Sequence, residues 1–375
     1  MTIMKKDEIF VKDILALADV KINGSNPWDI QIKNQDFYKR VLSQGSLGLG
    51  ESYMDGWWNC DDIDELFYKI LKADLEHKIV PLKLFYMVIK AKLLNPQSKK
   101  RAAHDVGYHY NLGNVLFENM LDKYMTYSCA YWKNSNKLDE AQEAKLKLIC
   151  DKIYLKPGMT LLDIGCGWGS LMKYAAQNYG TKCTGITLSQ EQVNLGTELC
   201  KGLPIEFRLK DYRDITGNYD RVVSVGMIEH VGSKNYRTFF RIMNKCLKDD
   251  GLFLLHTIGT LNPKTANADP WTDKYIFPGG ELPTVQRLAK AFEGLFVMED
   301  WHNFGVDYSK TTKAWFENFN RNWNKIKSDN YDERFYRMWK YFLFSQSGAF
   351  RSRRNHLWQI VLSKNGVPQG YNSVR

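Results

Sequence analysis

The chain has 375 residues, 44% hydrophobic and 25% charged, which excludes a disordered chain and leaves room for two domains. Its 52 basic and 42 acidic residues give a formal charge of +10, which favours an anionic partner, either nucleic acid or anionic lipid. Seven scattered cysteines with no C-x-x-C pair argue against a zinc site and for a reduced, cytoplasmic compartment.

Residues 1–80 are expected to form a small α-rich N-terminal domain. Apolar residues at helical spacing predict helices over 6–20 and 64–75, whereas residues 45–58 indicate a glycine-punctuated turn. The first ten residues lack the apolar core of a signal peptide. No run approaches the roughly 18 apolar residues of a transmembrane helix, so any membrane contact is expected to be peripheral.

Residues 81–103 are predicted to form a basic amphipathic helix and a linker. The stretch from 78 to 101 holds seven Lys or Arg and no acid, with Leu82, Phe85, Ile89 and Leu93 on one helical face. Such a helix suits an anionic membrane surface. An inter-domain helix with solvated lysines would show the same pattern, so both interpretations stay open.

Residues 104–375 show strand–helix alternation, which predicts a doubly wound α/β domain with a parallel sheet. Its strands are expected at 160–165, 182–187, 205–209, 219–225 and 250–258, and near 295–301 and 357–362. Helices are expected at 169–179, 189–200, 235–247 and 283–292. The Pro/Gly-rich insertion at 259–283 has the length and position of a lid.

The run LLDIGCGWG, residues 161–169, predicts a buried strand that breaks into a glycine turn before a helix. Its glycines follow G-x-G-x-G, whereas a dinucleotide fingerprint requires G-x-G-x-x-G and here has Ser170 at the third glycine. Glycines let a ligand approach the backbone closely. The spacing therefore favours S-adenosylmethionine over a nicotinamide dinucleotide.

The ends of the other predicted strands should converge on the same crevice. Thr187 stands where many methyltransferases place an acid, and Ser189 is suited both to capping the next helix and to binding a ribose. Glu229 and His230 follow the fourth predicted strand, where a carboxylate and an imidazole could orient a proton acceptor.

Several of these motifs together resemble the bacterial cyclopropane fatty acid synthases and the related mycolic acid cyclopropane synthases. The resemblance spans roughly residues 20 to 362, and its most particular motifs are SCAYW, GMIEHVG and DWHNFG. It implies a class I S-adenosylmethionine methyltransferase fold, Rossmann-like, behind a small N-terminal domain that presents lipid. The implied reaction is methylene transfer to the cis double bond of an unsaturated phospholipid acyl chain, through a carbocation that a bound bicarbonate ion deprotonates.

The resemblance also implies the site residues. The bicarbonate cage would comprise Cys129, Glu229, His256, the Ile258 backbone and Tyr308. The cofactor would be held by residues from four stretches: Tyr127 and Ser128; Asp163, Gly165, Cys166, Gly167, Trp168 and Gly169; Thr187, Leu188, Ser189, Gln190 and Gln192; Asp211 and Tyr212. No metal and no nucleic acid are expected.

The sequence leaves the product and the oligomeric state open, and it departs from the resemblance at one position. A methyl-branched or methylene product would need the same motifs, as would a catalytically silent lipid-binding relative. A homodimer at the inner face of the membrane would bring two lipid-facing surfaces together. Finally, Gln346 replaces a cysteine that several relatives carry, so a nucleophilic cysteine there is excluded and the position is interpreted as structural.

Overall fold

The computed structural model describes residues 3–75, 113–328 and 331–375, so the predicted basic helix and linker at 81–103 lie outside the described residues. The described residues form two compact units. Unit 1 combines residues 3–75 with Ala268–Pro278 and Tyr308–Asn355, and unit 2 combines residues 113–267 with Gly279–Asp307 and His356–Arg375. None of the described helices is both long and apolar enough to cross a bilayer.

Unit 1 is mainly helical. Its N-terminal part contains α1 (Ile3–Ala16), β1 (Gln31–Ile32), α2 (Phe37–Gln44), α3 (Ser46–Met54), β2 (Trp58–Asn59) and α4 (Ile63–Lys72). Its later segments contribute α12 (Pro270–Tyr275), α14 (Asp307–Arg321, whose first residue belongs to unit 2), α15 (Trp323–Ile326) and α16 (Glu333–Arg351). The α4 helix is predicted well because its ends are marked locally, by an Asp62 side chain that accepts from Glu65 N–H and by basic residues in the last turn.

The expected glycine turn at 45–58 is wrong, because most of it is helix α3. The glycines inside α3 allow close packing, whereas Gly45 and Gly56, at φ 60° and 74°, turn the chain on either side of the helix. A Cβ at Gly48 would lie 2.4 Å from the Arg40 carbonyl oxygen, and one at Gly50 would lie 2.3 Å from the indole of Trp271. The short residues therefore let α2 and α12 approach α3.

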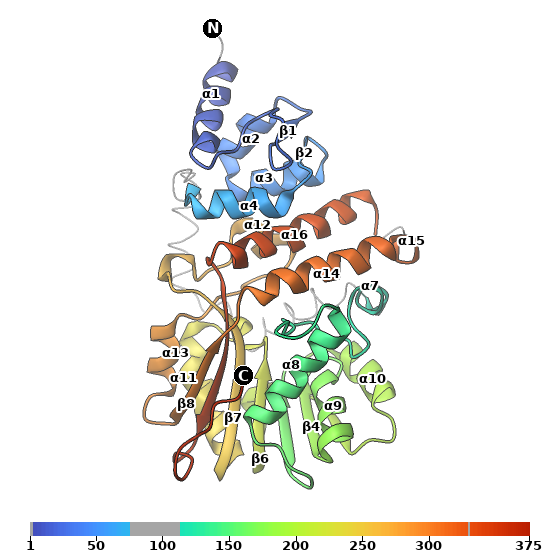
Figure 1. The fold of residues 1–375 in the computed structure, drawn as a ribbon, viewed down its shortest axis with the longest axis vertical. Helices are drawn as coiled ribbons and strands as arrows, with labels where there is room; N and C mark the ends of the chain where they lie inside the picture. The colour runs from blue at the N-terminus through green and yellow to red at the C-terminus, as the bar shows by residue number, and fades with distance from the viewer. Residues whose placement is uncertain (1–2, 76–112, 329–330) are drawn as a thin grey trace. The chain divides into compact units, whose positions relative to one another are not determined.

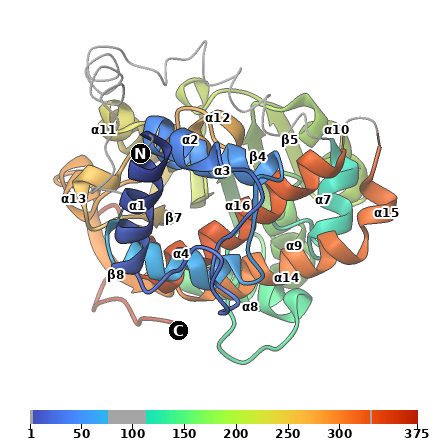
Figure 2. The same ribbon diagram turned by 90° about the horizontal axis from the view of Figure 1, so that it is seen from above.

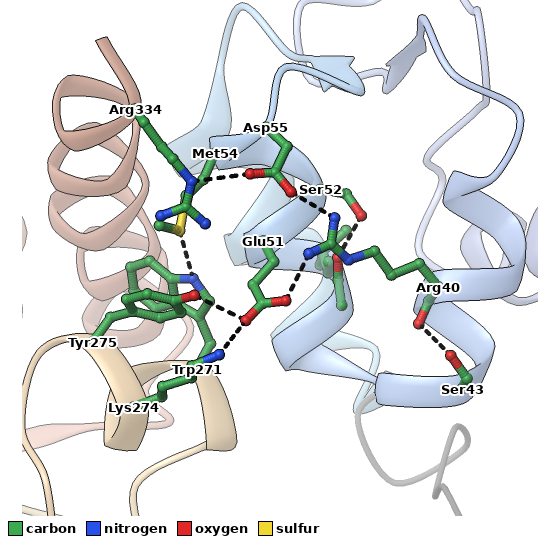
Figure 3. A network of polar contacts seen from close by, with 12 residues as sticks. Arg40, Ser43, Glu51, Ser52, Met54, Asp55, Trp271, Lys274, Tyr275 and Arg334 are labelled. Atoms are coloured by element: carbon green, nitrogen blue, oxygen red, sulfur yellow. Dashed lines mark hydrogen bonds and ion pairs between the residues drawn. The ribbon is translucent and has the colours of Figure 1, made fainter. Parts of the chain in front are cut away.

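A polar network inside unit 1 links α3 to the insertion helix α12 (Figure 3). The Glu51 carboxylate accepts from Arg40 at 2.6 Å, from Lys274 at 2.7 Å and from the Tyr275 hydroxyl at 2.9 Å. Burial alone would raise the pKa of Glu51, but hydrogen bonds from Lys274, Arg40 and Tyr275 outweigh it and lower the pKa to about 2. The middle of the expected lid is thus tied to the N-terminal helices.

We expect Glu51→Gln to lower the free energy of unfolding by about 2 kcal/mol at pH 7, because the change leaves Arg40 and Lys274 without the carboxylate that accepts from both. The folded-state pKa lies below the ordinary value of 4.5, so the stabilisation is present above that pH and is lost as the pH falls toward 2. Urea unfolding between pH 3 and 7 measures both effects. Asp55→Asn, with a side chain 29% exposed, is the matched control with a smaller expected loss. Equal losses for the two variants would contradict the assignment.

The sequence-based division into residues 1–80 and 104–375 differs from these units, because 268–278 and 308–355 pack with the N-terminal helices. Close packing of α16 on α4 illustrates the reason. A Cβ at Gly348 would lie 2.6 Å from Phe67 Cβ, and Arg351 donates to the buried Asp64 at 2.6 Å. Contacts across nearly 300 positions leave no local mark in the sequence.

Unit 2 is an α/β domain with a seven-stranded sheet in the order β5-β4-β3-β6-β7-β9-β8. The strands are β3 (Thr160–Ile164), β4 (Lys182–Thr187), β5 (Ile205–Leu209), β6 (Tyr219–Val225), β7 (Leu247–Gly259), β8 (Val297–Asn303) and β9 (His356–Ser363). The helices are α7 (Asn114–Met120), α8 (Leu138–Lys152), α9 (Ser170–Tyr179), α10 (Gln190–Leu199), α11 (Tyr236–Cys246) and α13 (Val285–Phe292). The predicted doubly wound α/β class is confirmed.

Both faces of the sheet are covered, with α8, α9 and α10 on one side and α11 and α13 on the other (Figure 1, Figure 2). Neighbouring strand residues enter opposite cores: Leu161 packs with α8 and α9, and Leu162 packs with α11. Successive side chains of a strand point to opposite faces of the sheet, and helices cover both faces. Both sets of side chains are therefore apolar in the central strands, which appear in the sequence as continuous apolar runs.

The expectation of an entirely parallel sheet is wrong for β9, which runs antiparallel to both β7 and β8. Asn303 at the end of β8 pairs with Trp358 near the start of β9. The chain therefore leaves β8 and enters β9 at the same end of the two strands, so β9 must run in the opposite direction to β8. Because Gln359 lies on β9, this reversal also decides which residue faces His256.

Candidate functional site

A cavity lies at the carboxyl ends of β3, β4, β5 and β6, where ligands bind in open α/β sheets. Its lining includes the residues that follow each of these strands: Gly165, Leu188, Lys210 and Gly226. Of the predicted cofactor residues, twelve line the cavity: Tyr127, Ser128, Asp163, Gly165, Cys166, Gly167, Trp168, Thr187, Leu188, Gln192, Asp211 and Tyr212. The structure therefore brings together four stretches far apart in the sequence.

The glycine turn connects β3 to α9 with three left-handed residues, at φ values of 82° for Gly165, 55° for Gly167 and 85° for Gly169. A Cβ at Gly165 would lie 2.8 Å from Met227 Cγ, and a Cβ at Gly169 would lie 2.5 Å from Phe207 Cζ. At Gly167 a Cβ would meet no atom within 4 Å. Gly165 and Gly169 are therefore constrained by packing as well as by φ, whereas Gly167 leaves open space at the cavity.

The segment carrying Tyr127 and Ser128 is held from two sides. Asp122 accepts from the Tyr124 and Thr126 backbone N–H groups at 3.0 and 2.7 Å, which closes the turn before them. From α8, Gln142 donates to the Ser128 carbonyl at 2.9 Å and Lys145 donates to the Ser128 hydroxyl at 2.7 Å. The two predicted residues are thus presented to the cavity by a helix for which the sequence analysis named no role.

At the end of β4, the Thr187 hydroxyl donates to Gln192 Oε1 at 2.6 Å, and both side chains line the cavity. Ser189 caps α10 by accepting from Gln192 N–H, as predicted, and donates to Glu191. Gln190 bonds to Asn194. Ser189, Gln190 and Gly169 belong to the predicted set but do not line the cavity, so their positions support the turn and the helix start.

Two opposite charges lie buried in the cavity wall. Burial raises the pKa of Asp163 to about 7 against the attraction of Lys145. Burial also lowers the pKa of Lys145 to about 8, against the attraction of Asp122, Cys129 and Asp163. Perturbed groups of this kind in a cleft are typical of functional sites.

A second group of side chains lies on η3 (Ile228–His230) and β7, beside the cavity. Glu229 Oε1 accepts from Ile258 N–H at 2.7 Å, and Gly226 N–H donates to the His256 carbonyl at 2.9 Å. Both Met227 and His230, the neighbours of Glu229, line the cavity. Cys129 is fully buried, and its thiol donates to the Ala130 carbonyl. Cys129, Glu229, His256 and Ile258 therefore all belong to unit 2.

His256 and Glu229 are both buried and electrically unusual. Burial, with the charges of Lys145 and Lys152, holds the pKa of His256 well below its ordinary value, so the ring is neutral. Burial raises the pKa of Glu229 to about 7, against hydrogen bonds from its own backbone and from Ile258. In the described part of the chain, Glu229 Oε2 and His256 Nε2 have no hydrogen-bond partner. Such orphaned buried atoms need an explanation, and a small polar ligand supplies one.

Gln359 is a neighbour of this group that the sequence analysis did not identify. It lies opposite His256 on β9, and its Nε2 is 3.3 Å from His256 Nδ1. If the Gln359 amide donates, the imidazole hydrogen is on Nε2, the atom without a partner. The His256 ring would then present a hydrogen-bond donor.

Tyr308, the fifth residue of the predicted cage, belongs to unit 1, where its ring stacks on Phe350 with centroids 4.5 Å apart. Its place in the cage stays a prediction. Gln346 also belongs to unit 1, and its Oε1 accepts from Asn355 at 3.5 Å.

The cavity also includes residues that sequence reasoning did not single out as site residues, among them Lys145 and Lys210. His230, which the sequence analysis did single out, lines the cavity as well. A signal for Lys145 was present. One helical stripe of α8 contains Leu138, Ala141, Gln142, Lys145, Ile149 and Lys152, and its three polar members are buried like the apolar ones. A lysine on a core-facing stripe marks a charge that must find a partner inside the protein.

Residues 97–360 match a family model described as mycolic acid cyclopropane synthetase. The chain is 53% identical to the cyclopropane-fatty-acyl-phospholipid synthase of Escherichia coli (strain K12), over 97% of this chain and 94% of that protein. It is 31% identical to the tuberculostearic acid methyltransferase UfaA1 of Mycobacterium tuberculosis, over 88% of this chain and 82% of that protein.

Among solved structures, the chain is similar to the mycolic acid cyclopropane synthase CmaA1 complexed with SAH and CTAB. The TM-score is 0.64 at 32% identity, covering 70% of this chain and 98% of that one. The cyclopropane synthase MmaA2 from Mycobacterium tuberculosis gives a TM-score of 0.65 at 31% identity, with the same coverage.

Proposed function

Because this chain belongs to the mycolic acid cyclopropane synthetase family, we propose that it transfers a methylene group from S-adenosylmethionine to the cis double bond of an unsaturated phospholipid acyl chain, forming a cyclopropane ring. The observation that carries the proposal is the 53% identity over 97% of the chain to a cyclopropane-fatty-acyl-phospholipid synthase. The cavity at the strand ends supports it, because its glycine turn and buried polar groups suit an amino-acid-bearing nucleoside.

S-adenosylmethionine supplies the methyl carbon when it is bound in the cavity. The π electrons of the alkene form a new carbon–carbon bond as the carbon–sulfur bond breaks, which leaves a positive charge on the acyl chain. Loss of a proton from the transferred methyl group then gives the electron pair that closes the ring. An alkene is a weak nucleophile, so the protein must hold it in line and exclude water, and only the second step requires a base.

The base in this proposal is a bicarbonate ion bound near Glu229 and His256. The fit is chemically sound, because a neutral His256 with hydrogen on Nε2 donates to an anion and a Glu229 that keeps its proton to about pH 7 does not repel one. Glu229 is held by Ile258 N–H, so its second oxygen faces one direction only. Cys129 and Tyr308 complete the proposed set. In the chain itself, these residues bind and orient the base.

A methyl-branched product is the second candidate. Relatives at 31 and 36% identity have the names of fatty acid methyltransferases. A methyl-branched product that keeps a double bond would differ from the cyclopropane only in which proton leaves the carbocation. The higher identity to the cyclopropane synthase favours ring closure.

The test is to incubate the purified protein with S-adenosylmethionine and vesicles of unsaturated phospholipid. We expect a gain of about 14 daltons on the acyl chains by mass spectrometry and cyclopropane protons in the NMR spectrum of the lipid. A methyl-branched spectrum would select the second candidate. Cofactor binding without any change in the lipid would instead identify a silent lipid-binding relative.

We also propose that the protein binds the membrane surface through the basic segment at 81–103, which the sequence alone supports. The charge-reversal variant Lys83→Glu, Lys90→Glu, Lys92→Glu should then sediment less with anionic vesicles, most visibly at low salt. Because a homodimer would place two such segments on one vesicle, the oligomeric state is measured alongside by analytical ultracentrifugation. Unchanged sedimentation would assign the segment to the protein interior.

A further inference from the structure

Lys145 is a buried lysine in the cavity that forms no ion pair with any described residue. It is 1% exposed, lies on α8 and lines the cavity. Its ammonium makes one contact, donating to the Ser128 hydroxyl at 2.7 Å. Within the described residues, no carboxylate oxygen lies within 4.0 Å of it. A buried charge without a partner is costly, so a missing partner points to a ligand.

Lys152 is a second buried lysine on α8, and its partners can be compared with those of Lys145. It lies seven residues further along α8, and its side chain is likewise fully buried. Asp300 lies 3.4 Å from its ammonium, and His302 Nδ1 lies 3.1 Å away. Lys152, which does not line the cavity, therefore has a carboxylate within ion-pair distance. Lys145, which lines the cavity, has none within 4.0 Å among the described residues.

The hydrogen bonds of Lys145 and Ser128 leave N–H and O–H donors that can bind a ligand. An ammonium has three N–H groups and no acceptor, and one N–H is used by Ser128. Because lysine cannot accept, the Ser128 hydroxyl hydrogen must point elsewhere, and it donates to no group in the described chain. Two kinds of donor, N–H and O–H, therefore meet at one place in the cavity wall.

An acceptor lies in the same cavity. Asp163 is 3% exposed, and its Oδ1 has no hydrogen-bond partner among the described residues. Cationic donors beside an isolated carboxylate oxygen match a zwitterion, whose carboxylate and ammonium need opposite partners.

We propose that Lys145 is the counter-ion for the carboxylate at the amino-acid end of S-adenosylmethionine, acting together with the Ser128 hydroxyl, while Asp163 accepts from the ammonium of that end. The inference rests on the proposed function, because it takes S-adenosylmethionine as the ligand. Lys145 would then favour the binding of ligands that carry the amino-acid end over nucleosides that lack it.

The experiment compares two probes by calorimetry: S-adenosylhomocysteine, which has the amino-acid end, and 5′-methylthioadenosine, which has the same nucleoside thioether without it. For Lys145→Met we expect the affinity for S-adenosylhomocysteine to fall by roughly 10- to 100-fold, as for a lost charge-assisted hydrogen bond. The affinity for 5′-methylthioadenosine should change by less than about twofold, which also shows that the variant is folded.

Two further variants make the result specific. Ser128→Ala removes only a hydroxyl and should show the same selectivity with a smaller loss, about 3- to 10-fold. Lys152→Met removes an equally buried ammonium from the same helix and should leave the ratio of the two affinities unchanged. Equal weakening of both probes by Lys145→Met, or no weakening of either, would overturn the inference.

These outcomes are separate from the vesicle assay. If Lys145→Met discriminates between the probes but the parent protein modifies no lipid, the inference stands and the proposed function fails. If lipid is modified but the variant does not discriminate, the proposed function stands and the inference fails.

Discussion

Replacing Glu229 with glutamine is expected to remove turnover and, at the same time, to make the folded protein more stable at pH 8. Glu229 is fully buried, with one oxygen bonded to Ile258 N–H and the other without a partner in the described chain. We expect turnover to fall by at least about 100-fold, the scale of a misplaced reacting group, because Glu229 orients the proposed base. Affinity for S-adenosylhomocysteine should be retained, because Glu229 does not line the cofactor cavity.

The gain in stability follows from the direction of the pKa shift. Burial raises the pKa of Glu229 from its ordinary 4.5 to about 7, so the unfolded chain releases its proton at a lower pH than the folded protein. Stability contributed by this residue is therefore lost as the pH rises from 4.5 to 7 and stays lost above 7. Glutamine does not ionise, so the variant should gain up to about 3 kcal/mol at pH 8 and almost nothing at pH 4.5.

Urea unfolding of both proteins at pH 4.5 and pH 8 measures the change in stability. Vesicle assays at pH 6.5, where Glu229 keeps its proton, measure the change in turnover. The control is Glu206→Gln, an exposed glutamate on β5 that pairs with Arg208 and should change neither quantity measurably. A Glu229→Gln variant that stays active, or that is less stable than the parent at pH 8, would show that Glu229 serves the fold.

Gly167→Ala is expected to weaken cofactor binding by roughly 10- to 100-fold with little damage to the fold. Gly167 lines the cavity, and an added Cβ would meet no protein atom within 4 Å. The methyl group would therefore occupy space that the ligand needs. The cost to the fold is limited to the left-handed conformation at φ 55°, roughly 1–2 kcal/mol.

Gly158→Ala is the matched control for this prediction. Gly158 has φ 83° and also has nothing within 4 Å of an added Cβ, but it lies in the turn before β3, away from the cavity. Both variants should lose similar stability in urea, and only Gly167→Ala should lose affinity for S-adenosylhomocysteine by calorimetry. Equal affinity in the two variants would contradict the role given to Gly167.

The sheet and the cofactor turn were predictable because their signals are local. Strand–helix alternation along the chain marked all seven strands of unit 2, and Ser189 marked the start of α10 by the capping chemistry that the structure contains. The glycine spacing at 165–169 indicated left-handed residues at a strand end, as observed. The same rules misjudged residues 45–58, since glycines that serve helix packing cannot be told by sequence from glycines that turn the chain.

What the sequence determined by itself is the set of strands, the glycine turn and, through the quoted motifs, the family. These depend on residues within a few positions of one another, so backbone preferences and burial periodicity are enough to reveal them. The partners of the buried polar groups depend on tertiary structure alone. Gln359 faces His256 only because β9 enters the sheet antiparallel, and Lys145 reaches Ser128 only because α8 packs beside the 122–128 segment. Contacts of this kind are selected by the packing of distant segments, which no local pattern encodes.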